Sequence, residues 1–223
     1  MPKNNIKLVI FDVNQTMFNL SEIEFRFRSI KLNPNSVNLW FTSILKEGFS
    51  SSINKVFVDF FSIARSELVK LGLLENRKLA NKEIKYILEG FNKLKMNPSV
   101  RESLSGIYKK GYSIVTLTNG SKKVTEKMLE YNQCKHLVKK CFSIDDMKLW
   151  KPNKKIYKYV CNKMNYDVGE SLMIASHSWD IYGAKTAGLK TGFIKNYEKV
   201  YPSYYTKPDY VGNDCLEIIK KIK

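Results

Sequence analysis

Short apolar runs bounded by polar residues recur along this chain, and they predict the strands of a buried sheet. The first run is Leu8-Val9-Ile10-Phe11, which leads directly into Asp12. Runs of this length without strict alternation are typical of strands that are covered on both faces. Similar runs follow at 112–118, 141–144, 171–175 and 190–194. The pattern therefore predicts five strands.

A different periodicity separates the first run from the others. From about Leu20 to Phe91 the chain has apolar residues at helical spacing, among them Val56, Phe57, Phe60, Phe61, Ala64, Leu68 and Leu71. Turn-forming residues interrupt this pattern at 19–21 and at 96–99, where Asn97 precedes Pro98. We therefore predict a helical cap at residues 20–96, inserted into a core domain formed by residues 1–19 and 97–223.

The order of the elements predicts the fold class. After Pro98 the strand-like runs alternate with helical patterns, which implies right-handed crossovers between parallel strands. The expected fold is α/β, with a doubly wound, Rossmann-like parallel sheet to which the first strand also belongs. At 223 residues with 43% hydrophobic content, the chain is long enough to bury such a core.

Composition narrows the cellular setting and the partners. No segment approaches the roughly 18 consecutive apolar residues of a membrane span, and residues 1–5 lead into the first run without a signal-peptide core. We expect a cytoplasmic protein without membrane contact. The net charge is +17, but its lysines are scattered and form no basic motif interleaved with aromatic residues. We therefore expect a solvated basic surface and no nucleic-acid partner.

The four cysteines indicate buried, reduced thiols and no zinc site. They show neither a CxxC pair nor metal-type spacing with either histidine; these residues are Cys134, Cys141, Cys161, Cys215, His136 and His177.

Polar residues follow the predicted strands at the points where ligand chemistry is found in open α/β sheets. Asp12 and Thr16 bracket the first turn, and Thr118-Asn119-Gly120-Ser121 closes the second run. Lys151-Pro152 follows the third run, and 176–180 follows the fourth with the sequence Ser-His-Ser-Trp-Asp. The carboxyl ends of parallel strands share one edge of a sheet, so these side chains are expected to converge.

In these motifs the sequence resembles the haloacid dehalogenase superfamily of hydrolases, and within it the L-2-haloacid dehalogenase (type II) branch. The resemblance runs through 11–16, 117–121, Lys151-Pro152 with Tyr157, and 176–185, and covers nearly the whole chain. It implies that Asp12 is the nucleophile that forms an ester with substrate, and that Thr16 and Thr118 hydrogen-bond near it. It further implies that Asn119 shapes the turn, that Lys151 steadies the charge of Asp12, and that Asp180 completes the site.

Elementary chemistry agrees with these roles. A neighbouring ammonium group keeps a carboxylate ionised and therefore nucleophilic, as Lys151 would do for Asp12. The ester must then be hydrolysed by an activated water. Asp180 is the first candidate for the base, and His177 is the second because imidazole titrates near neutral pH.

Asn14 favours carbon chemistry over phosphorus chemistry. Phosphatases of the superfamily carry an Asp two residues after the nucleophile, which protonates the leaving alcohol, and an acidic pair in the fourth motif that helps to bind Mg²⁺. Asn14 has no proton to donate, and Ser176 and His177 precede Asp180 without a second carboxylate. A halide leaves without protonation. We therefore expect no metal cofactor, with Mg²⁺ required only if the protein is a phosphatase.

The chain also departs from the dehalogenases it resembles. They typically have Tyr at the position of Asn14, Ser-Ser-Asn at the positions of 175–177, and an Arg after the Trp of an early cap helix, where this chain has Phe41. That Arg is associated with the substrate and the departing halide, and Phe41 has no charge to offer. Cations that could replace it from elsewhere in the cap are Arg26, Arg28, Lys46 and Arg65.

The sequence therefore predicts a hydrolase that cleaves the carbon–halogen bond of a small 2-halocarboxylate through an aspartyl ester. A Mg²⁺-dependent phosphatase of small phosphomonoesters and a non-catalytic binding protein of the same fold are the alternatives. Aromatic residues could form an apolar wall, namely Trp40, Phe41, Phe57, Phe60, Phe61 and Trp179. The residues expected to contact substrate are Asn14, Asn119, Phe60, Ser176, Trp179 and Tyr157. The resemblance also implies a homodimer.

Overall fold

A six-stranded parallel sheet forms the centre of the protein in a computed structural model that describes residues 5–222. The strand order is β3-β2-β1-β4-β5-β6, so the direction of strand addition reverses beside β1. The strands are β1 (Leu8–Phe11), β2 (Ser113–Thr118), β3 (Lys140–Ser143), β4 (Ser171–Ala175), β5 (Lys190–Ile194) and β6 (Tyr210–Gly212). The predicted doubly wound parallel sheet is confirmed.

The sequence pattern located five of these strands to within about one residue at each end. It missed β6, because Tyr210–Gly212 is only three residues long and only its last residue is buried. Such a segment has too few positions to show a period of two.

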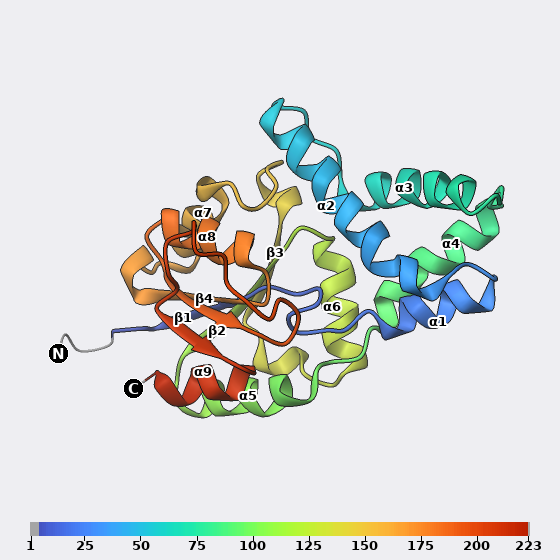
Figure 1. Cartoon of the computed structure of the whole chain (residues 1–223). Coiled ribbons are helices and arrows are strands. Elements are labelled where there is room, and N and C mark those ends of the chain that lie inside the picture. The colour runs from blue at the N-terminus through green and yellow to red at the C-terminus, as the bar shows by residue number, and fades with distance from the viewer. Residues whose placement is uncertain (1–4, 223) are drawn as a thin grey trace.

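Helices cover both faces of the sheet. In Figure 1, α7 and α8 lie on one side of the strands and α5 and α9 lie on the other. The core helices are α5 (Pro98–Lys109), α6 (Lys122–Tyr131), α7 (Lys154–Met164), α8 (Ser178–Thr186) and α9 (Cys215–Lys221). Because helices shield both faces, β1 and β4 are buried at every position, which explains their continuous apolar runs.

Four further helices lie to one side of the sheet, between β1 and α5 (Figure 1). They are α1 (Ser21–Ser29), α2 (Val37–Ile53), α3 (Phe60–Leu74) and α4 (Asn81–Glu89). Their apolar faces pack on one another, with Trp40 of α2 between Phe27 and Phe91. We call residues 21–93 the helical segment. The helical interpretation of Val56 and Phe57 is wrong, because both precede Asp59, whose carboxylate caps the start of α3.

The two connections between the helical segment and the sheet run side by side. The Asn19 amide donates to the Lys95 carbonyl at 3.0 Å, and the Asn97 amide donates to the Met17 carbonyl at 2.8 Å. Asn97 also donates through its side chain to the Thr16 carbonyl at 2.9 Å. The chain therefore enters and leaves the helical segment at one place, a few residues after β1 and Asp12.

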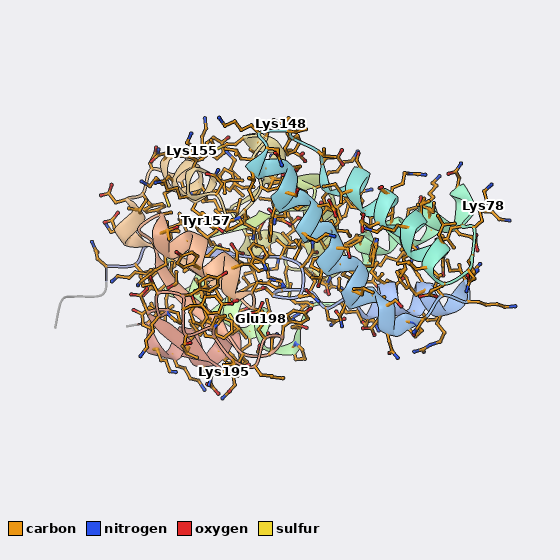
Figure 2. All side chains as sticks on the ribbon, turned by 45° about the horizontal axis from the view of Figure 1, so that its top comes forward. Lys78, Lys148, Lys155, Tyr157, Lys195 and Glu198 are labelled. Carbon is orange, nitrogen blue, oxygen red and sulfur yellow. The ribbon has the colours of Figure 1, made fainter. Side chains whose placement is uncertain are left out.

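Charge and cysteine placement follow the composition. The lysines labelled in Figure 2 are all exposed: Lys148 and Lys155 line one surface pocket, whereas Lys78 and Lys195 lie on distant parts of the surface. All four cysteines are buried and free of disulfides. No helix within residues 5–222 combines the length and the apolar character that a membrane crossing needs.

Candidate active site

The carboxylate of Asp12 is the centre of a buried polar cluster at the carboxyl edge of the sheet. Asp12 follows β1, and its backbone amide donates to the Ile174 carbonyl of β4 at 3.0 Å. Its side chain is nearly inaccessible to solvent. Oδ1 accepts from Nζ of Lys151 at 2.8 Å, and Oδ2 accepts from the Thr16 hydroxyl at 2.6 Å. The carboxylate is thus oriented by an ammonium group on one side and a hydroxyl on the other.

Lys151 joins two carboxylates. Its Nζ lies 2.6 Å from Oδ2 of Asp180 and donates also to the Leu117 carbonyl at 3.0 Å. With Asp12 this makes three acceptors for the three protons of the ammonium group. Asn119 fixes the backbone of the same residue, because its Oδ1 accepts from the Lys151 amide at 2.9 Å. The lysine is therefore held in one position without contact with water.

The pKa values of Asp12 and Asp180 shift in opposite directions. Burial raises the pKa of Asp12, but the charge of Lys151 and the hydrogen bond with His177 outweigh it, so that the pKa lies well below its ordinary value. Burial also raises the pKa of Asp180, and there the opposing charge of Lys151 does not suffice, so the pKa of Asp180 stays above its ordinary value. Desolvation lowers the pKa of Lys151, yet the charges of Asp12 and Asp180 raise it above 10.5 overall. Asp12 is the ionised nucleophile candidate of the pair.

Tyr157 holds Asp180 and does not face the substrate side. Its hydroxyl donates to Oδ1 of Asp180 at 2.5 Å. Burial, reinforced by the negative charge of Asp180, raises the pKa of Tyr157 well above its ordinary value, so the phenol keeps its proton. Tyr157 lies on α7 and is fully buried. Substrate contact by Tyr157, as expected from its motif, would require a different arrangement of this cluster.

A small cavity of about 10 Å³ opens beside Asp12, close to the space that one water molecule needs. Its lining combines polar residues from the strand ends with apolar residues from the helical segment: Asp12, Asn14, Phe41, Leu45, Phe60, Thr118, Asn119, His177 and Trp179. Typical ligand pockets enclose about 300–1,000 Å³. Substrate entry therefore requires the aromatic wall to move.

Several predicted residues line this cavity and others lie behind it. Asn14, Thr118, Asn119, His177, Phe60 and Trp179 line it, whereas Thr16, Lys151, Asp180, Ser176 and Tyr157 do not. The Ser176 amide donates to the Thr16 hydroxyl at 2.9 Å, so Ser176 helps to hold the turn that follows Asp12. The hydroxyl of Thr118 accepts from the Gly120 amide at 2.8 Å. Among the wall candidates, Trp40, Phe57 and Phe61 are also outside the lining.

None of the four cations considered as replacements for the missing arginine lines the cavity within the described chain. Arg26 is held by Glu22 and the Tyr86 carbonyl, and Lys46 pairs with Glu47 on the surface. Arg65 donates to Asn81. The cavity instead offers two unpaired amide atoms, Oδ1 of Asn14 and Nδ2 of Asn119, both buried and without a partner among residues 5–222.

Sequence reasoning missed two contributors to the site. Oε1 of Gln15 lies 3.0 Å from Nε2 of His177. The side-chain nitrogen of Gln15 donates to Oδ1 of Asn38, on α2, at 3.0 Å. Leu45, also on α2, completes the apolar wall. Gln15 lies within the first motif, but neither the motif nor the helical pattern indicates these contacts, since they depend on how α2 lies over the sheet edge.

The residues at this edge do not fit a magnesium ion. Mg²⁺ prefers six oxygen ligands, usually with at least one or two free carboxylate oxygens. Both oxygens of Asp12 and both of Asp180 already accept hydrogen bonds from Lys151, Thr16 or Tyr157. In residues 5–222 no group of three or more His, Cys, Asp or Glu side chains is placed to hold a metal.

The chain has recognisable relatives among known proteins. The sequence model of the haloacid dehalogenase-like hydrolase family matches residues 9–194. The chain is 24% identical over 166 residues to (S)-2-haloacid dehalogenase 1 of Pseudomonas sp. (strain CBS-3), covering 73% of this chain and 71% of the relative. It is also 24% identical over 151 residues to phosphoglycolate phosphatase of Haemophilus influenzae (strain 86-028NP), covering 63% and 67%.

The fold has close structural counterparts. The structure of L-2-haloacid dehalogenase from Xanthobacter autotrophicus with covalently bound chloropropionic acid superimposes with a TM-score of 0.89. The superposition covers 96% of this chain and 97% of that chain, at 17% sequence identity.

Proposed function

We propose that this chain, which belongs to the haloacid dehalogenase-like hydrolases, cleaves the carbon–halogen bond of a small 2-halocarboxylate through an ester of Asp12. The observation that carries the proposal is the pairing of an ionised Asp12 with Lys151 beside an apolar cavity in which Asn14 offers no acidic proton. The 2-haloacid dehalogenases among the relatives support the choice of substrate.

In the first step an oxygen of Asp12 attacks the carbon that bears the halogen. The new carbon–oxygen bond forms as the carbon–halogen bond breaks, and the halide leaves with the bonding electrons. No proton transfer is needed. The unpaired Nδ2 of Asn119 offers a donor for the substrate carboxylate or for the halide, and Phe41, Phe60 and Trp179 exclude water.

In the second step water hydrolyses the ester and restores Asp12. The oxygen of the water remains in the Asp12 carboxylate, and the hydroxyl oxygen of the product comes from Asp12. Lys151, which contacts Oδ1, stabilises negative charge on that oxygen as the tetrahedral intermediate forms. The helical segment supplies the outer wall through Phe41, Leu45 and Phe60, and we assign it the role of a cap.

Phosphomonoester hydrolysis is the second candidate, because phosphoglycolate phosphatases occur among the relatives. The absence of a carboxyl at position 14 and the poor fit of the site to Mg²⁺ argue against it.

Halide release tests the proposal. The purified protein is incubated with L-2-chloropropionate, L-2-bromopropionate and chloroacetate, and free halide is measured against an Asp12→Ala control. We expect release with at least one of these acids and none from the control. A parallel assay uses p-nitrophenyl phosphate with Mg²⁺, with and without EDTA. Phosphate release that EDTA abolishes, without halide release, would overturn the proposal in favour of the phosphatase.

A further inference from the structure

His177 lies between the nucleophile and a polar partner on the opposite side of its ring. Its Nδ1 is 3.2 Å from Oδ2 of Asp12, and its Nε2 is 3.0 Å from Oε1 of Gln15. The ring is almost fully buried, and it lines the cavity beside Asp12. Nδ1 therefore points toward the Asp12 carboxyl, and Nε2 points away from it.

Gln15 defines which nitrogen carries the permanent proton. Its Nε2 donates to Asn38, so its Oε1 faces His177 as an acceptor and favours a proton on Nε2. Gln15 has a left-handed backbone with φ of 62°, which is uncommon for a residue other than glycine. Strain of this kind persists where the surrounding structure maintains it, and functional sites are frequent examples. In the neutral ring, Nδ1 then carries the free electron pair beside Asp12.

The ring is held in place by its neighbours. Trp179 stacks on it with centroids 5.2 Å apart and an interplanar angle of 25°, and Tyr197 packs edge-on at 5.3 Å. The groups that face the imidazole are thus Asp12, Gln15 and these two aromatic rings. Of these four groups, Asp12 is the carboxylate, and it brings a negative charge next to Nδ1.

Asp180 is poorly placed to activate water. Its Oδ2 accepts from Lys151 at 2.6 Å and its Oδ1 accepts from Tyr157 at 2.5 Å. The side chain is completely buried and does not line the cavity. A general base must come within about 2.6–3.2 Å of the water whose proton it takes. Asp180 presents no oxygen to the cavity in which the water would lie, which favours a positioning role through Lys151.

We infer that His177, oriented by Gln15, is the general base that hydrolyses the Asp12 ester; this inference rests on the proposed function. Nδ1 takes a proton from water as the water oxygen bonds to Cγ of Asp12. The tetrahedral intermediate then breaks its bond between Cγ and the alkoxy oxygen, and this oxygen receives the proton from Nδ1. The remaining carboxyl proton passes to solvent as Asp12 returns to its ionised form.

Ester formation itself prepares His177 for this role. In the free site Nδ1 of His177 faces a negative oxygen of Asp12 at 3.2 Å. Alkylation of Asp12 removes that negative charge, so Nδ1 no longer has an anionic partner and its electron pair becomes available to water. The base is therefore released when the intermediate that needs it exists.

A rapid-quench experiment with intact-mass detection separates the two steps. The wild-type protein, His177→Gln and His136→Gln are mixed with a haloacid that the wild type dehalogenates. Gln is chosen because the dehalogenases that this chain resembles have Asn at position 177. His136 is exposed just before β3, outside the cavity lining, and provides a matched control. We expect His177→Gln to release about one equivalent of halide and to accumulate the Asp12 ester. Its ester decay should be about 10²–10⁴ times slower than in the wild type and in His136→Gln.

The pH dependence of ester decay provides a readout that a structural defect would not reproduce. A rate that depends on a general base has an acid limb, and this limb should be absent from the residual decay of His177→Gln. Gln15→Met keeps the size of the side chain and removes the acceptor. It should form the ester at the wild-type rate and hydrolyse it more slowly. Thermal melting of each variant identifies any loss of fold.

The outcomes distinguish the inference from the proposed function. Ester decay in His177→Gln at the wild-type rate, with the same acid limb, would overturn the role of His177. An Asp180→Asn variant that accumulates ester while His177→Gln does not would assign the base to Asp180. If the wild type itself releases no halide and acquires no mass on Asp12 with any haloacid, the proposed function fails.

Discussion

The ammonium group of Lys151 lies 2.8 Å from Oδ1 of Asp12, and the lysine side chain has no exposed surface. Asp180 is on the other side of the same ammonium group at 2.6 Å. One buried cation thus serves two buried carboxylates, and its removal would take the ammonium partner from both. The nucleophile owes its charge to this arrangement more than to its position at the end of β1.

Replacing Lys151 by Met should therefore impair both stability and chemistry. Breaking a buried ion pair by removing one partner typically costs about 3–5 kcal/mol, because the remaining charge is uncompensated. Unfolding in urea would measure the loss, and Lys154→Met, at the exposed first residue of α7, is the matched control. Halide release should fall to the level of Asp12→Ala. Wild-type stability in Lys151→Met would contradict the assignment.

The pH dependence of the first step follows from the shifted pKa values. The pKa of Asp12 lies well below its ordinary value and that of Lys151 lies above 10.5, so both groups stay charged over a wide range. The rate of Asp12 alkylation should be constant from about pH 5 to about pH 10. Single-turnover halide release across this range is the measurement. An acid limb in alkylation above pH 5 would show that Asp12 is protonated in the folded protein.

The same shifts predict how stability depends on pH. A lowered pKa stabilises the fold above the ordinary pKa of Asp, and this contribution is lost as the pH falls toward the pKa of the folded state. Asp12→Asn removes the contribution, so the difference in unfolding free energy between the wild type and this variant should narrow below about pH 4. Urea unfolding at several pH values tests it. A difference that stays constant between pH 7 and pH 3 would contradict the sign.

Gly183 allows the Lys151 loop to pack against α8. A Cβ atom at this position would lie 2.6 Å from Cβ and 2.7 Å from the carbonyl oxygen of Pro152, and 2.8 Å from the Tyr157 hydroxyl. Gly183→Ala should therefore displace the loop and cost about 1–3 kcal/mol. Gly106→Ala is the control, because its Cβ would meet no atom within 4 Å and should stabilise α5 by up to about 1 kcal/mol. Equal effects of the two variants on unfolding would refute the packing argument.

Phe41 occupies the position at which the dehalogenases that this chain resembles have an arginine. It lies on α2, is buried, and lines the cavity with Asp12. Phe41→Arg should lower KM for a 2-halocarboxylate by about tenfold, which corresponds to about 1.4 kcal/mol. The exposed Leu39→Arg on the same helix is the control. Unchanged KM in Phe41→Arg, with the fold intact by thermal melting, would show that the substrate carboxylate does not approach this wall.

The sequence by itself determined the parallel sheet and the residues at its edge. Unbroken apolar runs such as Leu8–Phe11 require burial on both faces, and burial on both faces requires helical crossovers. Those crossovers bring Asp12, Thr118, Lys151 and Asp180 to one side regardless of their separation along the chain. Periodicity alone was sufficient for this, because strand and helix periods differ.

Only the tertiary structure decided how those residues share the work. It directed both oxygens of Asp180 to Lys151 and Tyr157, and it placed His177 between Asp12 and Gln15. It also placed none of the predicted cap cations in the cavity within residues 5–222. These outcomes depend on side-chain directions and on how α2 and α3 lie over the sheet edge. A hydrogen bond requires its two atoms to lie within a few tenths of an ångström of the right distance, and no periodicity in the sequence encodes such a position. Burial of a strand or helix face, in contrast, produces a periodic pattern of apolar residues.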